Sequence, residues 1–163
     1  MHPRHMEHPK AIGDRSTLAI MVALERCGYQ LYLPFGENTR TDLVIDNGRF
    51  LARVQCKTGR LREGAVRFAV SGSCAHHRRR PVVRRHYHGE VDYFAVFCPE
   101  TEDVYLIPIA DLENRAGCSL RVAEPRNGQK RRIRTAADYT IGTVRLVPSS
   151  EPRASSGGPG SCA

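Results

Sequence analysis

The stretch TDLVIDNGRFLARVQCK, residues 41–57, decides the fold predicted for this chain. Asn47-Gly48 separates two largely apolar runs, and this dipeptide is the strongest short hairpin signal because both central residues of a type I′ turn need positive φ. A two-residue loop places Asp42 opposite Arg53. The stretch is therefore predicted to form two antiparallel strands joined by a tight turn.

Side chains of a strand alternate between its two faces, so Asp42 shares a face with Arg53, Gln55 and Lys57. Gln55 is then the diagonal neighbour of Asp42, within reach of a shared ion. An acid, an amide oxygen and a lysine at one end of a hairpin suit a hard divalent cation beside a phosphate. The competing interpretation is the solvated face of an ordinary half-polar sheet.

Composition narrows the class of protein. The chain has 163 residues, 40% of them hydrophobic, and a net charge of +8. Its length suffices for one domain with a core, and its positive charge favours a polyanionic partner, most often nucleic acid. There is no apolar run of about 18 residues, the length that would predict a membrane span. The six scattered cysteines form no CxxC pair. We expect a cytoplasmic protein with reduced thiols.

Capping and turn signals predict that a helix precedes the strands of a mixed sheet. The chain divides into a flexible arm (1–10), a domain (11–148) and a disordered Ser/Gly/Pro tail (149–163). Within the domain we expect an α/β layer, with a mixed, mostly antiparallel central sheet flanked by helices. The expected elements are a helix at 14–27, strands at 29–34, 41–57, 65–70, 91–98 and 104–109, a loop at 58–64, an irregular segment at 71–90, a short helix at 110–115 and weak strands within 118–142.

The order and spacing of several short motifs resemble the PD-(D/E)XK nuclease superfamily. The similarity is greatest to the subgroup of intron-encoded (group I intron-associated) homing endonucleases, which have a Gln-x-Lys motif. It covers roughly residues 10 to 142. The residues that carry it are Gly13-Asp14-Arg15-Ser16, Gly28-Tyr29, Pro34-Phe35-Gly36, Asp42-Leu43-Val44, Arg53-Val54-Gln55-Cys56-Lys57-Thr58, Val91-Asp92-Tyr93-Phe94-Ala95-Val96 and Val104-Tyr105-Leu106-Ile107-Pro108.

The resemblance implies a restriction-endonuclease-like core that hydrolyses phosphodiester bonds of duplex or branched DNA with Mg²⁺, or with Mn²⁺ in its place. Asp42 matches the metal-binding acid of the family, and Gln55 matches the second metal-binding position. The backbone carbonyl of Cys56 completes the ion's shell. Lys57 matches the lysine that orients or activates the attacking water and stabilises charge on the phosphorane. By analogy, cutting both strands favours a homodimer or larger assembly.

One position departs from the family pattern. Many relatives have Glu on the first helix where this chain has Thr17, and Thr17 supplies no charge to a metal. Asp14, one turn earlier, is a further candidate ligand. The alternative function is therefore a nucleic-acid-binding module with impaired catalysis on a retained nuclease fold.

Arginine-rich segments are the candidate DNA-binding surface, since phosphate contacts give affinity without reading sequence. Of two further hypotheses, a zinc site stays open and a cysteine nucleophile is set aside. The Cys and His residues of 74–88 have zinc-ligand chemistry without a finger spacing. Cys56 as a hydrolase nucleophile is disfavoured, because it alternates onto the core side of its strand. The candidate DNA-binding residues are Arg53, Arg60, Arg62, Arg78, Arg79, Arg80, Arg84, Arg85, Lys130, Arg131 and Arg132, and the zinc candidates are Cys74, His76, His77, His86 and His88.

Overall fold

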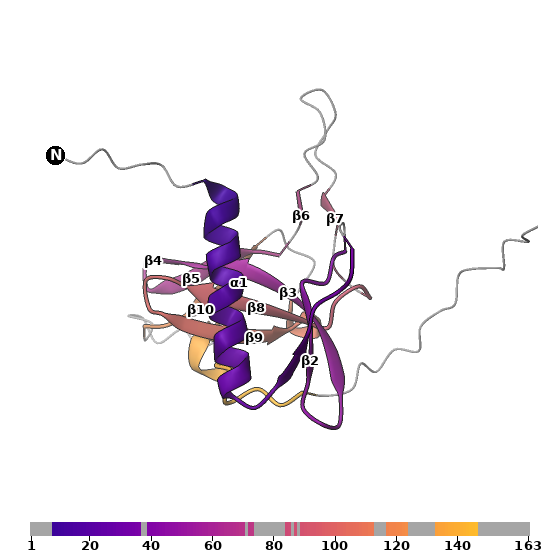
Figure 1. Ribbon diagram of the computed structural model, residues 1–163. Coiled ribbons are helices and arrows are strands. Elements are labelled where there is room, and N and C mark those ends of the chain that lie inside the picture. The colour runs from indigo at the N-terminus through magenta and orange to yellow at the C-terminus, as the bar shows by residue number, and fades with distance from the viewer. Residues whose placement is uncertain are drawn as a thin grey trace, which may run out of the picture.

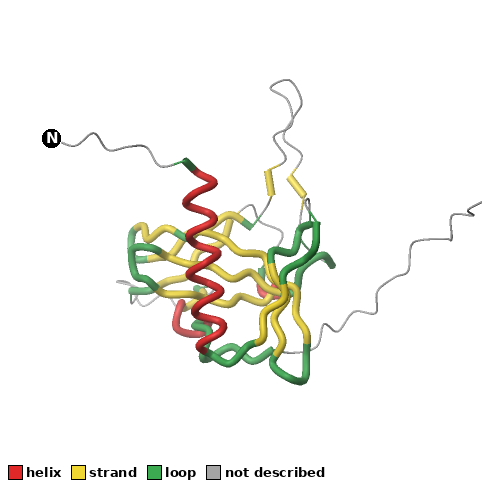
Figure 2. Tube along the Cα trace, in the orientation of Figure 1, coloured by secondary structure: helices red, strands yellow, loops and turns green. Residues whose placement is uncertain are grey.

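Figure 1 shows the computed structural model of the chain, which describes residues 8–36, 39–70, 72–73, 84–85, 87, 89–112, 117–123 and 133–146. One α-helix lies against the strands of a central sheet, and a second sheet lies behind it (Figures 1 and 2). The elements are α1 (Pro9–Arg26), β1 (Gln30–Tyr32), β2 (Leu43–Asp46), β3 (Leu51–Thr58), β4 (Arg60–Arg62), β5 (Ala65–Ala69), β6 (Gly72–Ser73), β7 (Arg84–Arg85), β8 (Tyr93–Cys98), β9 (Asp103–Pro108), β10 (Gly117–Arg121) and β11 (Arg134–Thr135), with 3₁₀ turns η1 (Ile109–Asp111) and η2 (Ala136–Tyr139).

Helix α1 begins at Pro9, so the predicted start at residue 14 was too late and residues 9–10 belong to the helix rather than to the arm. Pro9 suits the first helical turn because its missing N–H has no partner there. The Nδ1 of His8 accepts a hydrogen bond from the Lys10 amide at 3.3 Å. The helix ends before Gly28, whose φ of 85° satisfies the left-handed position that follows a helix.

The central sheet has the strand order β1-β2-β3-β8-β9. Only β3 and β8 run parallel, and every other neighbouring pair is antiparallel. The prediction of a mixed, mostly antiparallel sheet is therefore confirmed. Among the described residues no helix is long and apolar enough to span a membrane.

The two faces of the central sheet are covered differently. Helix α1 covers one face, where Ile20 and Leu24 pack on strand side chains such as Ala95. The other face packs against a second sheet of order β11-β10-β5-β4, with Phe94 and Val96 facing it. The expected α/β layer is therefore present, with one α-helix on the first face and a second sheet on the other. Because β8 is buried on both faces, it has the continuous apolar sequence of an interior strand.

Gly59 is where the chain leaves the central sheet for the second one. Residues 58–64 were expected to form a loop, but β4 begins directly after Gly59. A Cβ at Gly59 would lie 2.6 Å from Cγ1 of Val66 and 2.9 Å from Cγ1 of Val96. The bend between the sheets therefore requires glycine, because no side chain fits between the two valines.

The β2–β3 connection differs from the predicted two-residue turn. Arg53 pairs with Val44, whereas the two-residue turn would place it opposite Asp42, so the register is shifted by two residues. The reason lies in Asn47, whose side-chain oxygen accepts hydrogen bonds from the amides of Arg49 (3.0 Å) and Phe50 (2.8 Å) and closes a longer turn. A shift of two residues keeps every side chain on its predicted face.

Candidate active site

Asp42, the residue before β2, lies beside Gln55 of β3. Oδ2 of Asp42 accepts hydrogen bonds from Nε2 of Gln55 at 2.5 Å and from the amide of Cys56 at 2.7 Å. The backbone amide of Asp42 donates to the carbonyl of Val54 at 2.9 Å. The predicted acid and amide are thus brought together more closely than the diagonal arrangement expected from sequence.

Three oxygens at this point suit a hard divalent cation. Within the described residues, Oδ1 of Asp42 and Oε1 of Gln55 accept no hydrogen bond. The amide of Cys56 points toward Asp42, and the N–H and C=O of one strand residue point to the same side, so the Cys56 carbonyl faces this edge too. A carboxylate, an amide oxygen and a peptide carbonyl form the hard oxygen set that Mg²⁺ accepts.

Burial changes the acidity of Asp42. Desolvation raises its pKa above the ordinary value of 3.8, while the Cys56 amide and the Lys57 charge act in the opposite direction. A cation that binds beside a half-buried carboxylate stabilises its charged form, which burial otherwise disfavours. The raised pKa of Asp42 is therefore consistent with a carboxylate that binds a cation.

Lys57 is held by a residue that sequence reasoning missed. Its Nζ donates to the hydroxyl of Tyr87 at 3.3 Å and lies 5.0 Å from the centre of that ring and 5.8 Å from the ring of Phe94. Tyr87 lies in the segment treated as an irregular basic insertion, and nothing in the local pattern connects it with β3. Only the tertiary fold brings the two side chains together.

The N-terminal half of α1 forms the opposite wall of a cleft of about 690 Å³ that includes Asp42 and Lys57. Asp14 and Thr17 line this cleft from the helix. Oγ1 of Thr17 donates to the carbonyl of Gly13 at 3.1 Å, as a helical threonine commonly does. Among the residues that the structure describes, the cleft thus has one acidic side chain, Asp42, on the hairpin wall and one, Asp14, on the helix wall.

The helix is tied to the end of β3 by a buried contact. Oγ of Ser16 lies 2.7 Å from Oγ1 of Thr58 and donates to the carbonyl of Ile12 at 3.0 Å. Ser16 is the buried polar residue of α1 in this structure. This contact fixes the distance between the two walls of the cleft.

Cys56 packs on the core side of β3, as its alternation predicts. Burial and the nearby Asp42 raise the pKa of its thiol to about 12, despite lowering contributions from the Thr17 side chain and Lys57. The thiol therefore keeps its proton near neutral pH and is not an activated nucleophile.

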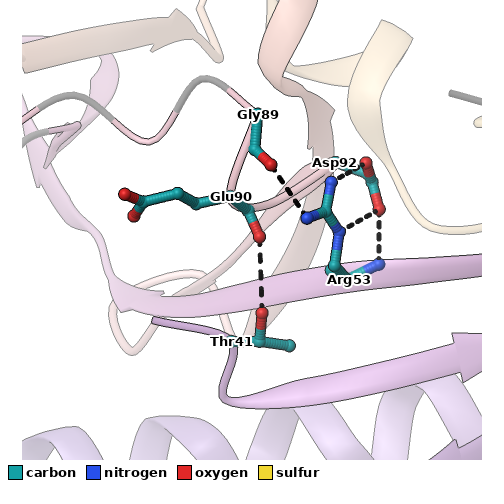
Figure 3. Close-up of polar contacts among 5 residues, drawn as sticks. All are labelled: Thr41, Arg53, Gly89, Glu90 and Asp92. Atoms are coloured by element: carbon teal, nitrogen blue, oxygen red, sulfur yellow. Dashed lines mark hydrogen bonds and ion pairs between the residues drawn. The ribbon is translucent and has the colours of Figure 1, made fainter. Parts of the chain in front are cut away.

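Arg53 supports the chain that follows Tyr87. Its Nε and amide N donate to Oδ2 of Asp92 at 3.1 and 2.8 Å, Nη2 donates to Oδ1 of Asp92 and Nη1 donates to the carbonyl of Gly89, each at 2.9 Å (Figure 3). Thr41 adds a 3.5 Å hydrogen bond to the carbonyl of Glu90. The Asp92 hydrogen bond is the largest cause of a raised pKa of the Arg53 guanidinium.

Arg60 and Arg62 lie elsewhere, on the outer side of the second sheet. With Arg67 and Arg134 they line a hollow of about 620 Å³ that shares no lining residue with the cleft. Two of these arginines have carboxylate partners, since Arg60 lies 3.6 Å from Glu100 and Arg67 pairs with Glu63. The side chains of the other candidate DNA-binding and zinc residues lie outside what the structure describes, namely Arg78, Arg79, Arg80, Arg84, Arg85, Lys130, Arg131, Arg132, Cys74, His76, His77, His86 and His88.

The cleft is lined by Asp14 of the helix and by Asp42 and Lys57 of the hairpin, and Gln55 is hydrogen bonded to Asp42. The family model for PD-(D/E)XK endonucleases matches residues 7–142, and the chain belongs to this family. A search of curated proteins finds no match. The family assignment confirms the resemblance drawn from the short motifs.

Two solved structures are similar to this chain. The bacterial homing endonuclease I-Ssp6803I aligns with a TM-score of 0.67 at 22% identity, over 82% of this chain and 89% of its own. Hjc, a Holliday junction resolvase of the archaeal hyperthermophile Archaeoglobus fulgidus, aligns with a TM-score of 0.40 at 15% identity, over 67% and 83%. The first similarity confirms a restriction-endonuclease-like fold.

Proposed function

We propose that this protein is a divalent-metal-dependent endonuclease that hydrolyses phosphodiester bonds in DNA, with Mg²⁺ as the working ion and Mn²⁺ as a substitute. The observation that carries the proposal is that Asp42 and Lys57 line the cleft beside α1, and that Gln55 is hydrogen bonded to Asp42. Membership of an endonuclease family supports it.

Each residue has a definite role in this proposal. Asp42, Gln55 and the Cys56 carbonyl hold the ion through their oxygens, and Asp14 adds a carboxylate from the helix wall. Lys57 directs its ammonium toward the attacking water and the scissile phosphate, where it offsets the negative charge that develops in the transition state. The bound ion supplies Lewis-acid polarisation of a phosphoryl oxygen.

The arginines of the second sheet are proposed to hold the DNA backbone. Arg60 follows Lys57 by three residues, so their Cα atoms lie at most about 10 Å apart. Arg62, Arg67 and Arg134 extend the positive surface away from the cleft. Arg53 has a different proposed role: three of its five guanidinium N–H bonds donate to Asp92 and Gly89, so it braces the 89–92 segment instead of contacting phosphate.

Thr17 favours a second candidate function. A nuclease site with Asp42 as its one strand-borne acid binds cations weakly, because ligand charge largely sets affinity for hard ions. A protein that has lost this affinity retains DNA binding through its arginines without cutting. The alternative is thus a DNA-binding module that uses the same fold.

Supercoiled, linear and branched DNA incubated with Mg²⁺ or Mn²⁺ tests the proposal. Wild type is expected to nick or cut at least one substrate, and Asp42→Ala is expected to lose this activity. Thr17→Glu is expected to increase cleavage at low Mg²⁺, because it restores a carboxylate on the helix wall. If wild type leaves all substrates intact while Thr17→Glu cuts them, the DNA-binding alternative is correct.

A further inference from the structure

Tyr87 is a buried side chain with several independent restraints. It is 7% exposed and packs edge-on against Phe94, with ring centres 5.2 Å apart and an interplanar angle of 81°. Its carbonyl accepts hydrogen bonds from the amides of Glu90 and Val91 at 3.0 and 3.2 Å. Both the ring and the backbone of Tyr87 are therefore fixed.

Arg40 adds a further restraint from the segment before β2. Its guanidinium carbon lies 4.9 Å from the centre of the Tyr87 ring, and its Nε is 2.8 Å from a carboxylate oxygen of Glu90. Because the Glu90 amide donates to the Tyr87 carbonyl, Arg40, Glu90 and Tyr87 form a closed set of contacts. This set is independent of Lys57.

From these contacts we propose that Tyr87 is the positioning residue for the Lys57 ammonium. The hydroxyl of Tyr87 accepts one of the three N–H bonds of Lys57 at 3.3 Å. The other two N–H bonds are left to face the water and the phosphate. This inference rests on the proposed nuclease function, because it assigns the way in which that site's lysine is held.

The physical reason is conformational entropy. A lysine ammonium ends a flexible four-carbon chain, so an unrestrained Lys57 would sample many positions in the cleft. Reactions that depend on a charge near the developing phosphorane lose rate when that charge is displaced by about 1 Å, by as much as about a hundredfold. A fixed hydroxyl acceptor on a buried ring removes this loss without adding charge to the cleft.

A purely structural tyrosine would make different predictions. If Tyr87 only fills the core between Phe94 and the second sheet, its ring is sufficient and the hydroxyl is dispensable. Tyr87→Phe keeps the ring and removes the hydroxyl alone. Tyr105→Phe is the matched control, because Tyr105 is also buried and its hydroxyl also has a hydrogen-bond partner, the carboxylate of Asp103, to which it donates at 3.2 Å.

The experiment combines kinetics with a spectroscopic readout on the full chain. Single-turnover cleavage of DNA with Mg²⁺ is expected to slow about tenfold to a hundredfold in Tyr87→Phe, with KM changed less than about twofold, and to be unchanged in Tyr105→Phe. Lysine-selective NMR is expected to show a slowly exchanging ammonium signal, assigned by its absence in Lys57→Ala, that disappears in Tyr87→Phe. Both Phe variants are expected to melt within about 4 °C of wild type.

An unchanged rate together with an unchanged ammonium signal in Tyr87→Phe overturns the assignment. A rate loss accompanied by a melting shift well beyond that of Tyr105→Phe also overturns it, because the effect is then one of packing. If wild type cuts no DNA but the ammonium signal depends on Tyr87, the positioning contact stands and the nuclease proposal fails. The two claims are therefore separable.

Discussion

Gln55 donates its side-chain amide to the same oxygen of Asp42 that accepts the Cys56 backbone amide. The acid and the glutamine are thus a hydrogen-bonded pair across the hairpin before any ion binds. Within the described residues, the amide oxygen of Gln55 and Oδ1 of Asp42 accept no hydrogen bond. The pair is a preformed oxygen site whose one formal charge comes from Asp42.

Gln55→Glu is expected to destabilise the metal-free protein and strengthen ion binding. Two carboxylates at hydrogen-bond distance repel, and a divalent ion relieves the repulsion. Mn²⁺ affinity measured by calorimetry is expected to rise on the order of tenfold to a hundredfold, since an added charge acts at close range. Gln30→Glu, on the edge strand β1, is the control and should change neither quantity. Unaltered affinity in Gln55→Glu would contradict the assignment of Gln55 to the ion site.

Asp42→Asn is expected to stabilise the metal-free protein increasingly as pH rises. Burial raises the pKa of Asp42, so the folded state holds the proton more tightly than the unfolded chain. Between the unfolded pKa and the raised folded pKa, the unfolded chain has already released its proton, and wild-type stability falls by that contribution as pH increases. Asparagine has no such loss.

Urea denaturation in chelator measures this effect, as the free energy of unfolding of Asp42→Asn minus that of wild type. The difference is expected to grow from strongly acidic pH to neutral pH and then stay level. Asp138→Asn, an exposed position on η2, serves as the control for general charge effects. A difference that stays flat, or that shrinks as pH rises, would contradict the raised pKa of Asp42.

Arg53→Lys is expected to lower the free energy of unfolding by about 1–2 kcal/mol, because lysine cannot reproduce a paired, planar contact with Asp92. The two side chains are 27% and 15% exposed, so solvent screens the pair only in part. DNA affinity, measured by fluorescence anisotropy, should change little. Arg62→Gln should do the reverse, with weaker and less salt-dependent DNA binding at unchanged stability. Equal losses of DNA affinity in both variants would show that Arg53 contacts DNA.

Gly59→Ala is expected to destabilise the fold by about 1–3 kcal/mol, because its Cβ would overlap Val66 and Val96 in the interior. Gly13→Ala is the matched control. Its Cβ would meet nothing within 4 Å, and alanine favours a helix by about 0.5–1 kcal/mol. Thermal or urea denaturation of the two variants should therefore shift in opposite directions. A neutral Gly59→Ala would mean that the bend between the sheets has room for a side chain.

The site residues of the hairpin were predictable from sequence, because side chains separated by an even number of residues along a strand lie on the same face. Asp42, Gln55 and Lys57 share a face in any register that differs by an even number of residues. The actual register was missed, since the Asn47 side chain accepts two backbone amides and lengthens the turn. The predicted register differs from the actual one by two residues, an even number, so the predicted site residues still share one face.

The second sheet was harder to predict. Strand β4 is three residues long and its first and last residues are arginines, so its sequence resembles a polar loop. Its partner β5 also pairs with β10, which follows much later in the chain. The Lys57–Tyr87 contact was missed for the same reason. Such pairings depend on tertiary structure and leave no local periodic signal.

The helix start was a missed signal. Pro9 directly after a residue that can cap the helix is a recognised sign of a first turn, yet the predicted helix begins only at residue 14. Asp14 instead lies within α1 and lines the cleft. This change strengthens its candidacy as a metal ligand, which is part of the proposal.

The central claim is that Lys57 and the oxygens beside it form a working hydrolytic site. Its most direct test is the single-turnover rate of supercoiled DNA nicking at saturating Mg²⁺, for wild type and Lys57→Ala at equal DNA occupancy, with Lys10→Ala as the control. The account predicts measurable nicking by wild type and Lys10→Ala, and a loss of about a hundredfold to a thousandfold in Lys57→Ala. Equal rates in all three proteins, or no nicking by wild type at any Mg²⁺ or Mn²⁺ concentration, would contradict it.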